Sequence, residues 1–218
     1  MSTNGGSPHG GKDDGRTPQE TEVTLDASSL RGLAHPLRVK FLDLLRTEGP
    51  ATVTRLADRT GVSSASASYH VRQLAQYGFV EEQTRSGGGR ERWWKAVHRT
   101  TRVRPADLVG SDEVGALADT YLRGVTALYA EQTQRAIDEL PQLPAEWRAA
   151  STTSDFELRL SAEQLKSLVE EIFRTVERYR AEGGPAADGV GETAPVTLQI
   201  QAFPRPGTLT GSEPHEPE

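Results

Sequence analysis

Between residues 30 and 77, apolar side chains recur every three or four positions, which is the spacing of helices with one buried face. The stretch LRGLAHPLRVKFLDLL predicts two such helices, and Pro36 is expected to begin the second because proline suits the first helical position. The stretch ATVTRLADRTGV predicts a short third helix that closes at Gly61. Ser63 then stands at an N-cap position, and a fourth helix is predicted over 64–77. Two helices joined by a short glycine-containing turn form the helix-turn-helix pattern.

The fourth predicted helix divides into a core face and an outward face. Ala67, Val71 and Leu74 fall on one side of it and are expected to face the core, with His70 at the edge. Small hydroxyls at its start fit close against base edges in a major groove, and longer polar side chains further along reach bases or phosphates. The residues expected to face DNA are Ser64, Ser66, Ser68, Tyr69, Arg72 and Gln73, with Ser64 and Ser68 on the flanks. The alternative is a polar face that only contacts water.

A β-hairpin pattern follows the fourth helix. Phe79–Thr84 and Glu91–Val97 read as strands, and the glycine-rich stretch between them reads as a turn. Trp93 and Trp94 point to opposite faces of the second strand, so one of them is expected to anchor the hairpin on the core. Three arginines flank the turn and are expected to contact the DNA backbone or the minor groove: Arg85, Arg90 and Arg92. The hairpin therefore predicts a wing.

Taken together, residues 30–97 resemble the winged helix-turn-helix regulators of the arsenic-repressor-like (ArsR-type) family. The resemblance rests on three stretches in order: LAHPLRVKFLDLL, ATVTRLADRTGVSSASASYHVRQLAQYGFVEE and GRERWWKAV. It implies a homodimeric, DNA-binding transcription regulator, often a repressor that a small ligand releases from DNA. It also implies groove-reading positions at Ser64, Ser66, Ser68 and Tyr69.

The chain departs from the metal-sensing members of that family. Those members carry a cysteine motif where this chain has ATVTRL, or an Asp/His set on a later dimer helix. This chain has no cysteine at all, and no histidine falls within 112–140. We therefore expect neither a metal site nor metal sensing.

Charge is distributed unevenly along the chain, whose formal net charge is -6. Residues 31–104 hold 14 Lys and Arg against 6 Asp and Glu, whereas the remainder holds 11 basic and 25 acidic residues. A basic segment inside an acidic chain indicates a unit that binds nucleic acid.

The stretch 112–140 predicts one long helix with a broad apolar stripe, ended by the prolines that follow it. Such a stripe needs a covering surface, and we expect a second copy of the chain to supply it. The residues expected at this dimer interface are Leu117, Tyr121, Val125 and Leu128. Packing of the stripe within one chain is the alternative.

Residues 154–204 predict a small α+β unit that binds an effector or a partner. DFELRL and VTLQIQAF, residues 155–160 and 196–203, read as strands. Between them, Ser161 and Gln164 form a capping box that opens a helix with a regular apolar stripe.

The predicted fold is mainly α with small β. It comprises a disordered tail over 1–25, a winged helix-turn-helix domain over 26–104, the long dimerisation helix, the α+β unit and an acidic disordered tail over 205–218. No catalytic set, cofactor motif or membrane span is recognisable, so we expect a cytoplasmic, non-enzymatic protein. Its expected partners are double-stranded DNA, a second copy of the chain and, by the resemblance, a small-molecule effector. The expected function is a homodimeric repressor of a palindromic operator. A winged-helix protein-interaction module without sequence-specific DNA binding is the alternative.

Overall fold

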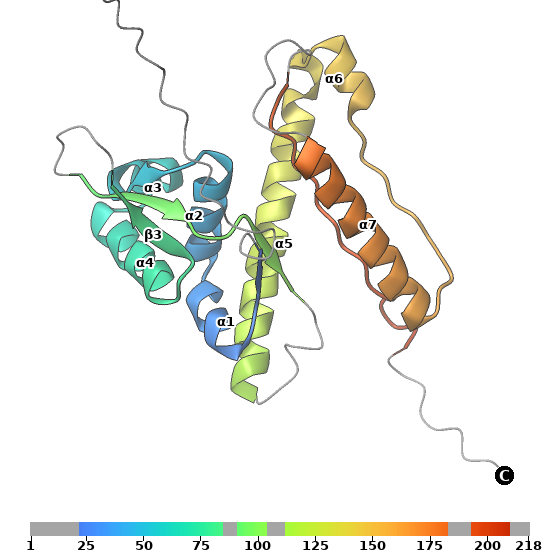
Figure 1. Ribbon diagram of the computed structural model, residues 1–218, viewed down its shortest axis with the longest axis horizontal. Coiled ribbons are helices and arrows are strands. Elements are labelled where there is room, and N and C mark those ends of the chain that lie inside the picture. Colours follow the sequence, from blue (N-terminus) through green and yellow to red (C-terminus); the bar gives the residue numbers. More distant parts are fainter. Residues whose placement is uncertain (1–21, 85–90, 104–111, 183–192, 210–218) are drawn as a thin grey trace, which may run out of the picture. The chain divides into compact units, whose positions relative to one another are not determined.

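The computed structural model describes residues 22–84, 91–103, 112–182 and 193–209 (Figure 1). The chain divides into two compact units, Met1–Asp138 and Glu139–Glu218, and each is described by itself. The first unit contains the predicted winged domain together with nearly all of the long helix, which sequence reasoning treated as a separate segment.

The described residues of the first unit form five helices and five short strands. The helices are α1 (Ala27–Leu33), α2 (Pro36–Thr47), α3 (Val53–Thr60), α4 (Ser64–Gln76) and α5 (Asp112–Glu139). Pro36 begins α2 as predicted, and the ring of His35 caps this helix because its Nδ1 accepts a hydrogen bond from the Leu37 backbone N–H at 3.1 Å. Asp26 caps α1 through a reciprocal pair of hydrogen bonds with Ser29.

The strands form two small sheets, and the predicted hairpin is confirmed with narrower bounds. In the first sheet, β2 (Ala51–Thr52), β4 (Trp93–Ala96) and β3 (Val80–Gln83) lie antiparallel in that order. Trp94 packs against the core from β4, as one tryptophan of the pair was expected to do. In the second sheet, β1 (Glu22–Thr24) pairs in parallel with β5 (Thr100–Arg102).

The prediction of a disordered N-terminal tail over 1–25 is wrong for residues 22–25. Residues 22–24 form β1, and Leu25 beside them is fully buried in the core. Two or three residues are too few to show an alternating pattern, so β1 and β2 could not be identified from the sequence. Residues 1–21 of this predicted tail lie outside the described residues. The same holds for residues 210–218 of the predicted C-terminal tail.

The core of the first unit brings α1, α2, α3 and α4 against the antiparallel sheet. Its largest fully buried side chains are Leu25, Leu30, Leu33, Phe41, Leu56, Val71, Leu74 and Phe79. Gly32 allows the closest approach, because a Cβ at this position would lie 2.7 Å from side-chain atoms of Tyr77 and Phe79. The backbone of α1 therefore rests directly on the turn between α4 and β3.

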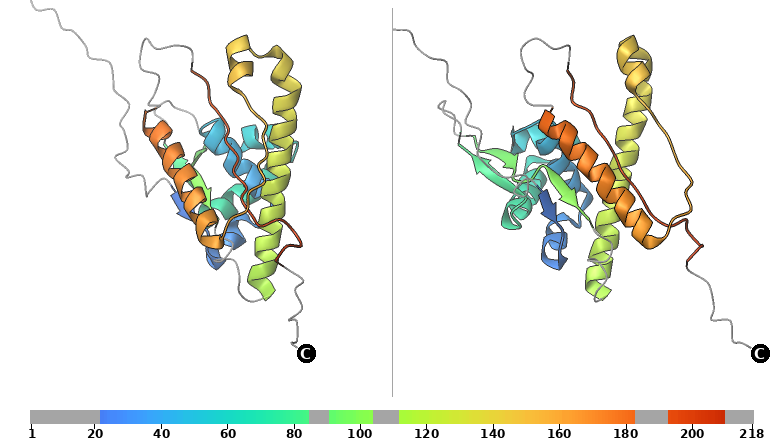
Figure 2. Two further views of the ribbon diagram at one scale, coloured as in Figure 1. Left: turned by 90° about the vertical axis from the view of Figure 1, so that its right-hand side faces the viewer. Right: turned by 45° about the vertical axis from the view of Figure 1, so that its right-hand side comes forward.

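The helix α5 lies beside α2 (Figures 1 and 2). Ala118 and Tyr121 are buried in the same core as the winged domain. Two polar contacts reinforce this packing: Lys40 Nζ lies 3.0 Å from Glu131 Oε1, and Gln132 donates to Asp43 Oδ2 at 2.9 Å. Burial raises the pKa of Asp43, and the hydrogen bond from Gln132 opposes that shift.

The second unit is helical, with a 3-10 turn (Leu140–Gln142), α6 (Ala145–Ala150) and α7 (Ala162–Glu182). The predicted capping box is confirmed, since Gln164 N–H donates to Ser161 Oγ at 3.2 Å and Ser161 N–H donates to Gln164 Oε1 at 2.8 Å. The prediction of strands over 155–160 and 196–203 is wrong. Neither segment belongs to a sheet, because no ladder pairs it with another described residue.

Candidate nucleic-acid interface

A tight turn fixes the angle between α3 and α4. Gly61 ends α3 in the left-handed region with φ of 70°, which glycine adopts without steric cost, and the Val62 N–H donates to Ala57 O at 3.1 Å. Ser63 then caps α4, because its Oγ accepts from the Ser66 N–H at 3.2 Å. Both caps were predicted, and together they give the helix-turn-helix its geometry.

The inner face of α4 is locked into the core. Ala67, Val71 and Leu74 are fully buried, as predicted. His70 is 6% exposed, and the centroid of its ring lies 4.3 Å from that of His35 and 6.3 Å from that of Phe41. This packing fixes the orientation of α4 about its own axis, and therefore also the direction of its other face.

The outward face of α4 carries the residues predicted to contact DNA. Tyr69 is 55% exposed and is the largest side chain on this face. Ser64 is exposed and Ser66 half-buried, and neither hydroxyl has a hydrogen-bond partner among the residues that the structure describes. No Asp or Glu occurs anywhere in α4. The face therefore offers hydroxyl donors and acceptors with no negative charge to repel phosphate.

Two longer polar side chains lie further along this face. Arg72 folds back along the helix, donating from Nε to Ser68 O at 3.1 Å and from Nη2 to Ser68 Oγ at 3.2 Å. Gln73 Nε2 donates to Gln76 Oε1 at 3.3 Å. In the part of the chain that the structure describes, no carboxylate lies within ion-pair distance of Arg72. Its charge is therefore held only by weak, exposed hydrogen bonds that an external anion would replace.

The wing places one of its three predicted arginines within the described residues. Arg92 is highly exposed beside β4, with Nε 3.7 Å from Glu82 Oε1 across the hairpin. Arg85 and Arg90 lie outside the described residues. Lys95 and Glu81 form a second cross-strand pair of opposite charges at 3.0 Å.

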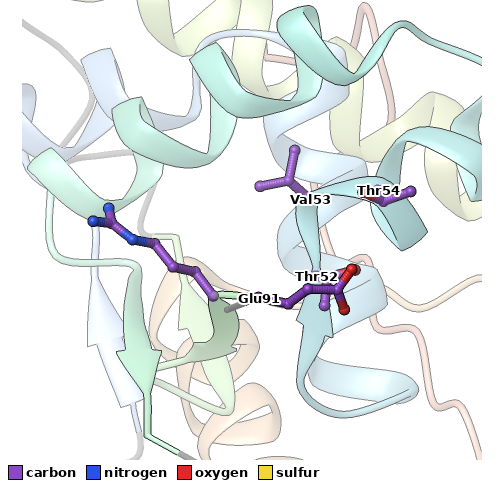
Figure 3. A pocket seen from close by; sticks show the side chains of 5 residues that line it. Thr52, Val53, Thr54 and Glu91 are labelled. Carbon is purple, nitrogen blue, oxygen red and sulfur yellow. The ribbon is translucent and has the colours of Figure 1, made fainter. Parts of the chain in front are cut away.

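A hollow of about 220 Å³ lies between the start of α3 and the wing. Thr52, Val53, Thr54, Glu91 and Arg92 line it, and Figure 3 shows Val53 and Thr54 on the helix side with Glu91 facing Thr52. Small-molecule sites are generally larger, at about 300–1,000 Å³. The hollow is therefore small for an effector site.

A cluster of basic groups that the sequence did not reveal lies beneath α4. The Arg38 guanidinium is buried and donates from Nη2 to Arg31 O at 2.9 Å, beside the rings of His35 and His70. Burial, followed by the charge of Arg38, lowers the pKa of His35. The pKa of His70 is lowered by burial, then by His35 and by Arg38. Helical spacing places such residues on a face, but only the assembled fold shows that they share an interior.

The four residues predicted at a dimer interface face the interior of this chain. Tyr121 is buried, and Leu117, Val125 and Leu128 are half-buried against the winged-domain core. This is the intrachain packing that the sequence left open as the alternative. On the outward side of α5, Leu122 and Ile137 are exposed large apolar side chains.

In the part of the chain that the structure describes, no group of three or more His, Cys, Asp or Glu is placed to hold a metal ion. None of the described helices combines the length and the hydropathy that a membrane crossing requires.

Residues 33–83 match the family model of the helix-turn-helix domain. This segment runs from the end of α1 through the whole of α2, α3 and α4 to the end of β3. The predicted winged helix-turn-helix fold is therefore confirmed. No curated protein matches the chain.

Three solved structures are similar to this chain. Reduced HlyU from Vibrio cholerae is 20% identical, with 44% of this chain and 83% of that one covered and a TM-score of 0.29. The homodimeric winged helix-turn-helix domain of Mb0332 from Mycobacterium bovis, a possible ArsR-family regulator, is 23% identical over 50% of this chain and 82% of that one, with a TM-score of 0.30. The adhesin competence repressor AdcR from Streptococcus pyogenes is 16% identical over 67% and 81%, with a TM-score of 0.29. Because these TM-scores are low, the fold of this chain is established by its own helices and strands and not by the three similar structures.

Proposed function

Because residues 33–83 form a helix-turn-helix domain, we propose that this protein is a DNA-binding transcriptional regulator that inserts α4 into the major groove. The outward face of α4 carries the proposal. It combines the exposed Tyr69, two serine hydroxyls without described partners, and an arginine that has no described carboxylate partner, on a helix that the core holds rigidly. A rigid element is what sequence reading requires, since base edges are distinguished by hydrogen-bond geometry.

The proposed contacts fall into two classes. Ser64, Ser66, Ser68, Tyr69 and Gln73 supply base-edge contacts, the serines where the groove is closest and Tyr69 with the longest reach. Arg72 leaves Ser68 on binding and pairs with a phosphate or a base. The wing contacts the backbone through its three arginines, Arg85, Arg90 and Arg92, and supplies affinity that is independent of sequence.

The protein acts as a homodimer on a palindromic site. A helix of 13 residues is about 20 Å long, so one copy of α4 contacts only a few base pairs. Two copies related by a two-fold axis read two half-sites about one helical turn apart, with far greater affinity than either alone. In this proposal α5 contributes to the contact through the exposed Leu122 and the exposed parts of Leu117, Val125 and Leu128, while Tyr121 stays in the core of its own chain.

Repression follows from the same geometry, because a dimer seated on an operator occludes the DNA beneath it. We propose further that the protein does not sense metal, which the lack of cysteine supports. Its DNA-binding role supports a cytoplasmic location. An effector would act by changing the spacing between the two copies of α4.

Selection of bound sequences tests the proposal. The full chain is incubated at physiological salt with a pool of random duplexes, and bound DNA is recovered and sequenced over several rounds. We expect enrichment of a palindrome with half-sites 10–11 base pairs apart. Recovery of DNA without any enriched motif, or no recovery at all, would leave a winged-helix module that binds protein and would overturn the proposal.

A matched pair of variants tests whether α4 is the element that recognises the DNA sequence. Tyr69→Ala removes an exposed tyrosine from the outward face, and Tyr179→Ala removes a comparably exposed tyrosine from α7. The first is expected to lose the enriched motif and the second to retain it.

A further inference from the structure

Residues 155–160 are an extended segment whose large apolar side chains all face solvent. The sequence DFELRL alternates, so that Phe156, Leu158 and Leu160 share one side and the charged residues share the other. The three apolar side chains are 83%, 62% and 42% exposed. Figure 1 shows the segment as an extended trace between α6 and α7.

The backbone of this segment is also unpaired. In the described part of the chain, none of its N–H or C=O groups takes part in a hydrogen bond to another residue. A strand with free edges and a fully apolar side is a template for pairing with another strand. A polypeptide in extended conformation is therefore the kind of partner that satisfies both features at once.

The charges of the segment fit a second copy of itself. When two copies pair antiparallel about a two-fold axis through Leu158, each Glu157 lies opposite the partner's Arg159, and each Arg159 opposite the partner's Glu157. On the apolar side, Phe156 lies opposite Leu160 of the partner subunit at both ends, and the two copies of Leu158 meet at the axis. Centring the axis on Glu157 instead would set two carboxylates against each other, so the charges specify one register.

We propose that residues 155–160 pair with the same segment of a second copy of this chain, as an antiparallel two-stranded ribbon centred on Leu158. The contact is isologous, so it closes on itself and limits the assembly to a dimer. This inference rests on the dimer of the proposed function and assigns it a surface separate from α5 and from the DNA-contacting helix. The helix α7 directly follows the strand through the Ser161 cap, so the ribbon ties the second units of the two copies together.

Cysteine cross-linking tests the register, because the natural chain has no cysteine. In the proposed ribbon the two Leu158 Cα atoms lie about 5 Å apart, within the range of a disulfide. The two Phe156 Cα atoms lie about 14 Å apart, beyond that range. Under mild oxidation of the full chain, Leu158→Cys is expected to give a covalent dimer in high yield and Phe156→Cys, its matched control, almost none.

Charge reversal tests the pairing without any cross-link. Glu157→Arg alone sets arginine opposite arginine at both sites, and Arg159→Glu alone sets glutamate opposite glutamate. Each is expected to raise the dimer dissociation constant, measured by sedimentation equilibrium, on the order of tenfold. An equimolar mixture of the two single variants restores both ion pairs, so it is expected to form heterodimers as tight as the natural homodimer.

The outcomes distinguish failure of the proposed ribbon from failure of the proposed dimeric regulator. Equal cross-linking at both positions, or a mixture that dimerises no better than either variant alone, overturns the ribbon while the proposed regulator stands. A wild-type chain that sediments as a monomer at micromolar concentration overturns the dimer itself. Unchanged dimerisation in both charge variants would also overturn the ribbon, because the dimer contact would then not depend on Glu157 and Arg159.

Discussion

At the scale of single residues, neighbouring serines of one short stretch have different tasks. Ser63 holds the start of α4 because its Oγ accepts a backbone hydrogen bond, whereas the hydroxyl of Ser66 has no described partner. A cap contributes to stability and a free hydroxyl does not, so the two side chains are separable by experiment.

Replacing each serine by alanine is expected to have opposite effects. Ser63→Ala removes the cap and lowers the free energy of unfolding by about 1 kcal/mol. Ser66→Ala leaves the melting temperature unchanged or slightly higher, since alanine is the better helix former, but weakens operator binding by about 1 kcal/mol. Thermal unfolding and a binding titration on each variant measure both quantities. Full operator affinity in Ser66→Ala would show that this face only contacts water.

Gly32 is expected to tolerate no side chain. Because a Cβ there would lie 2.7 Å from Tyr77 and Phe79, Gly32→Ala should lower the free energy of unfolding by about 1–3 kcal/mol. Gly115→Ala, on the open side of α5, is the control and is expected to stabilise by about 0.5–1 kcal/mol, because alanine favours the helix. Denaturant unfolding compares the two, and equal changes would refute the close approach of α1.

His70 is expected to make stability fall as the solution becomes acidic. Its pKa in the folded chain lies below the ordinary value near 6.5, so the unfolded chain takes up the proton first as the pH falls. Its contribution is complete above about pH 6.5 and is lost below that pH. The free energy of unfolding measured between pH 7.5 and 5 should decline less steeply in His70→Gln than in the natural chain. Identical slopes would mean that the ring is not held neutral by burial.

At the scale of elements, predictability depended on length and on local signals. The helices α2, α3 and α4 were predictable because Pro36, Gly61 and Ser63 mark their ends in the sequence itself. The capping box of α7 was predictable for the same reason. The pairing of β1 with β5 was not, because it joins short segments far apart in sequence.

The apolar stripe of α5 shows another limit of sequence reasoning. Periodicity predicts that one face of a helix is covered, but it does not say by what. Here Tyr121 is covered by the core of its own chain, through packing along α2. In the candidate site the same distinction holds, since the outward direction of Tyr69 was predictable and the burial of Arg38 was not.

The wing is expected to supply affinity rather than sequence preference. Replacing Arg85 and Arg90 by alanine should weaken binding to all duplexes alike and reduce the slope of log affinity against log salt by about 0.9 for each lost phosphate contact. Arg123→Ala is the control, because that arginine is exposed on α5 and pairs with Asp119. Titrations at several salt concentrations measure the slope. A changed motif in the double variant would show that the wing reads bases.

At the scale of the whole molecule, the two units have separate tasks in this account. The first holds the reading helix on a rigid core, and its segment 31–104 carries the excess of positive charge. The second carries extended segments with exposed apolar side chains and an amphipathic helix, which suit contacts with another polypeptide. Net acidity of the chain as a whole is compatible with DNA binding because the charges are segregated along the sequence.

The central claim is that α4 reads sequence, and the ratio of two dissociation constants tests it most directly. Fluorescence anisotropy titrations at 150 mM salt compare the selected palindrome with a scrambled duplex of equal length. For the natural chain and for Tyr179→Ala, the palindrome should bind at least about 10³-fold more tightly. In Ser66→Ala combined with Tyr69→Ala, the ratio should fall more than tenfold while the melting temperature and the affinity for the scrambled duplex stay the same. A natural chain that binds both duplexes equally, or a double variant that keeps the full ratio, would contradict the account.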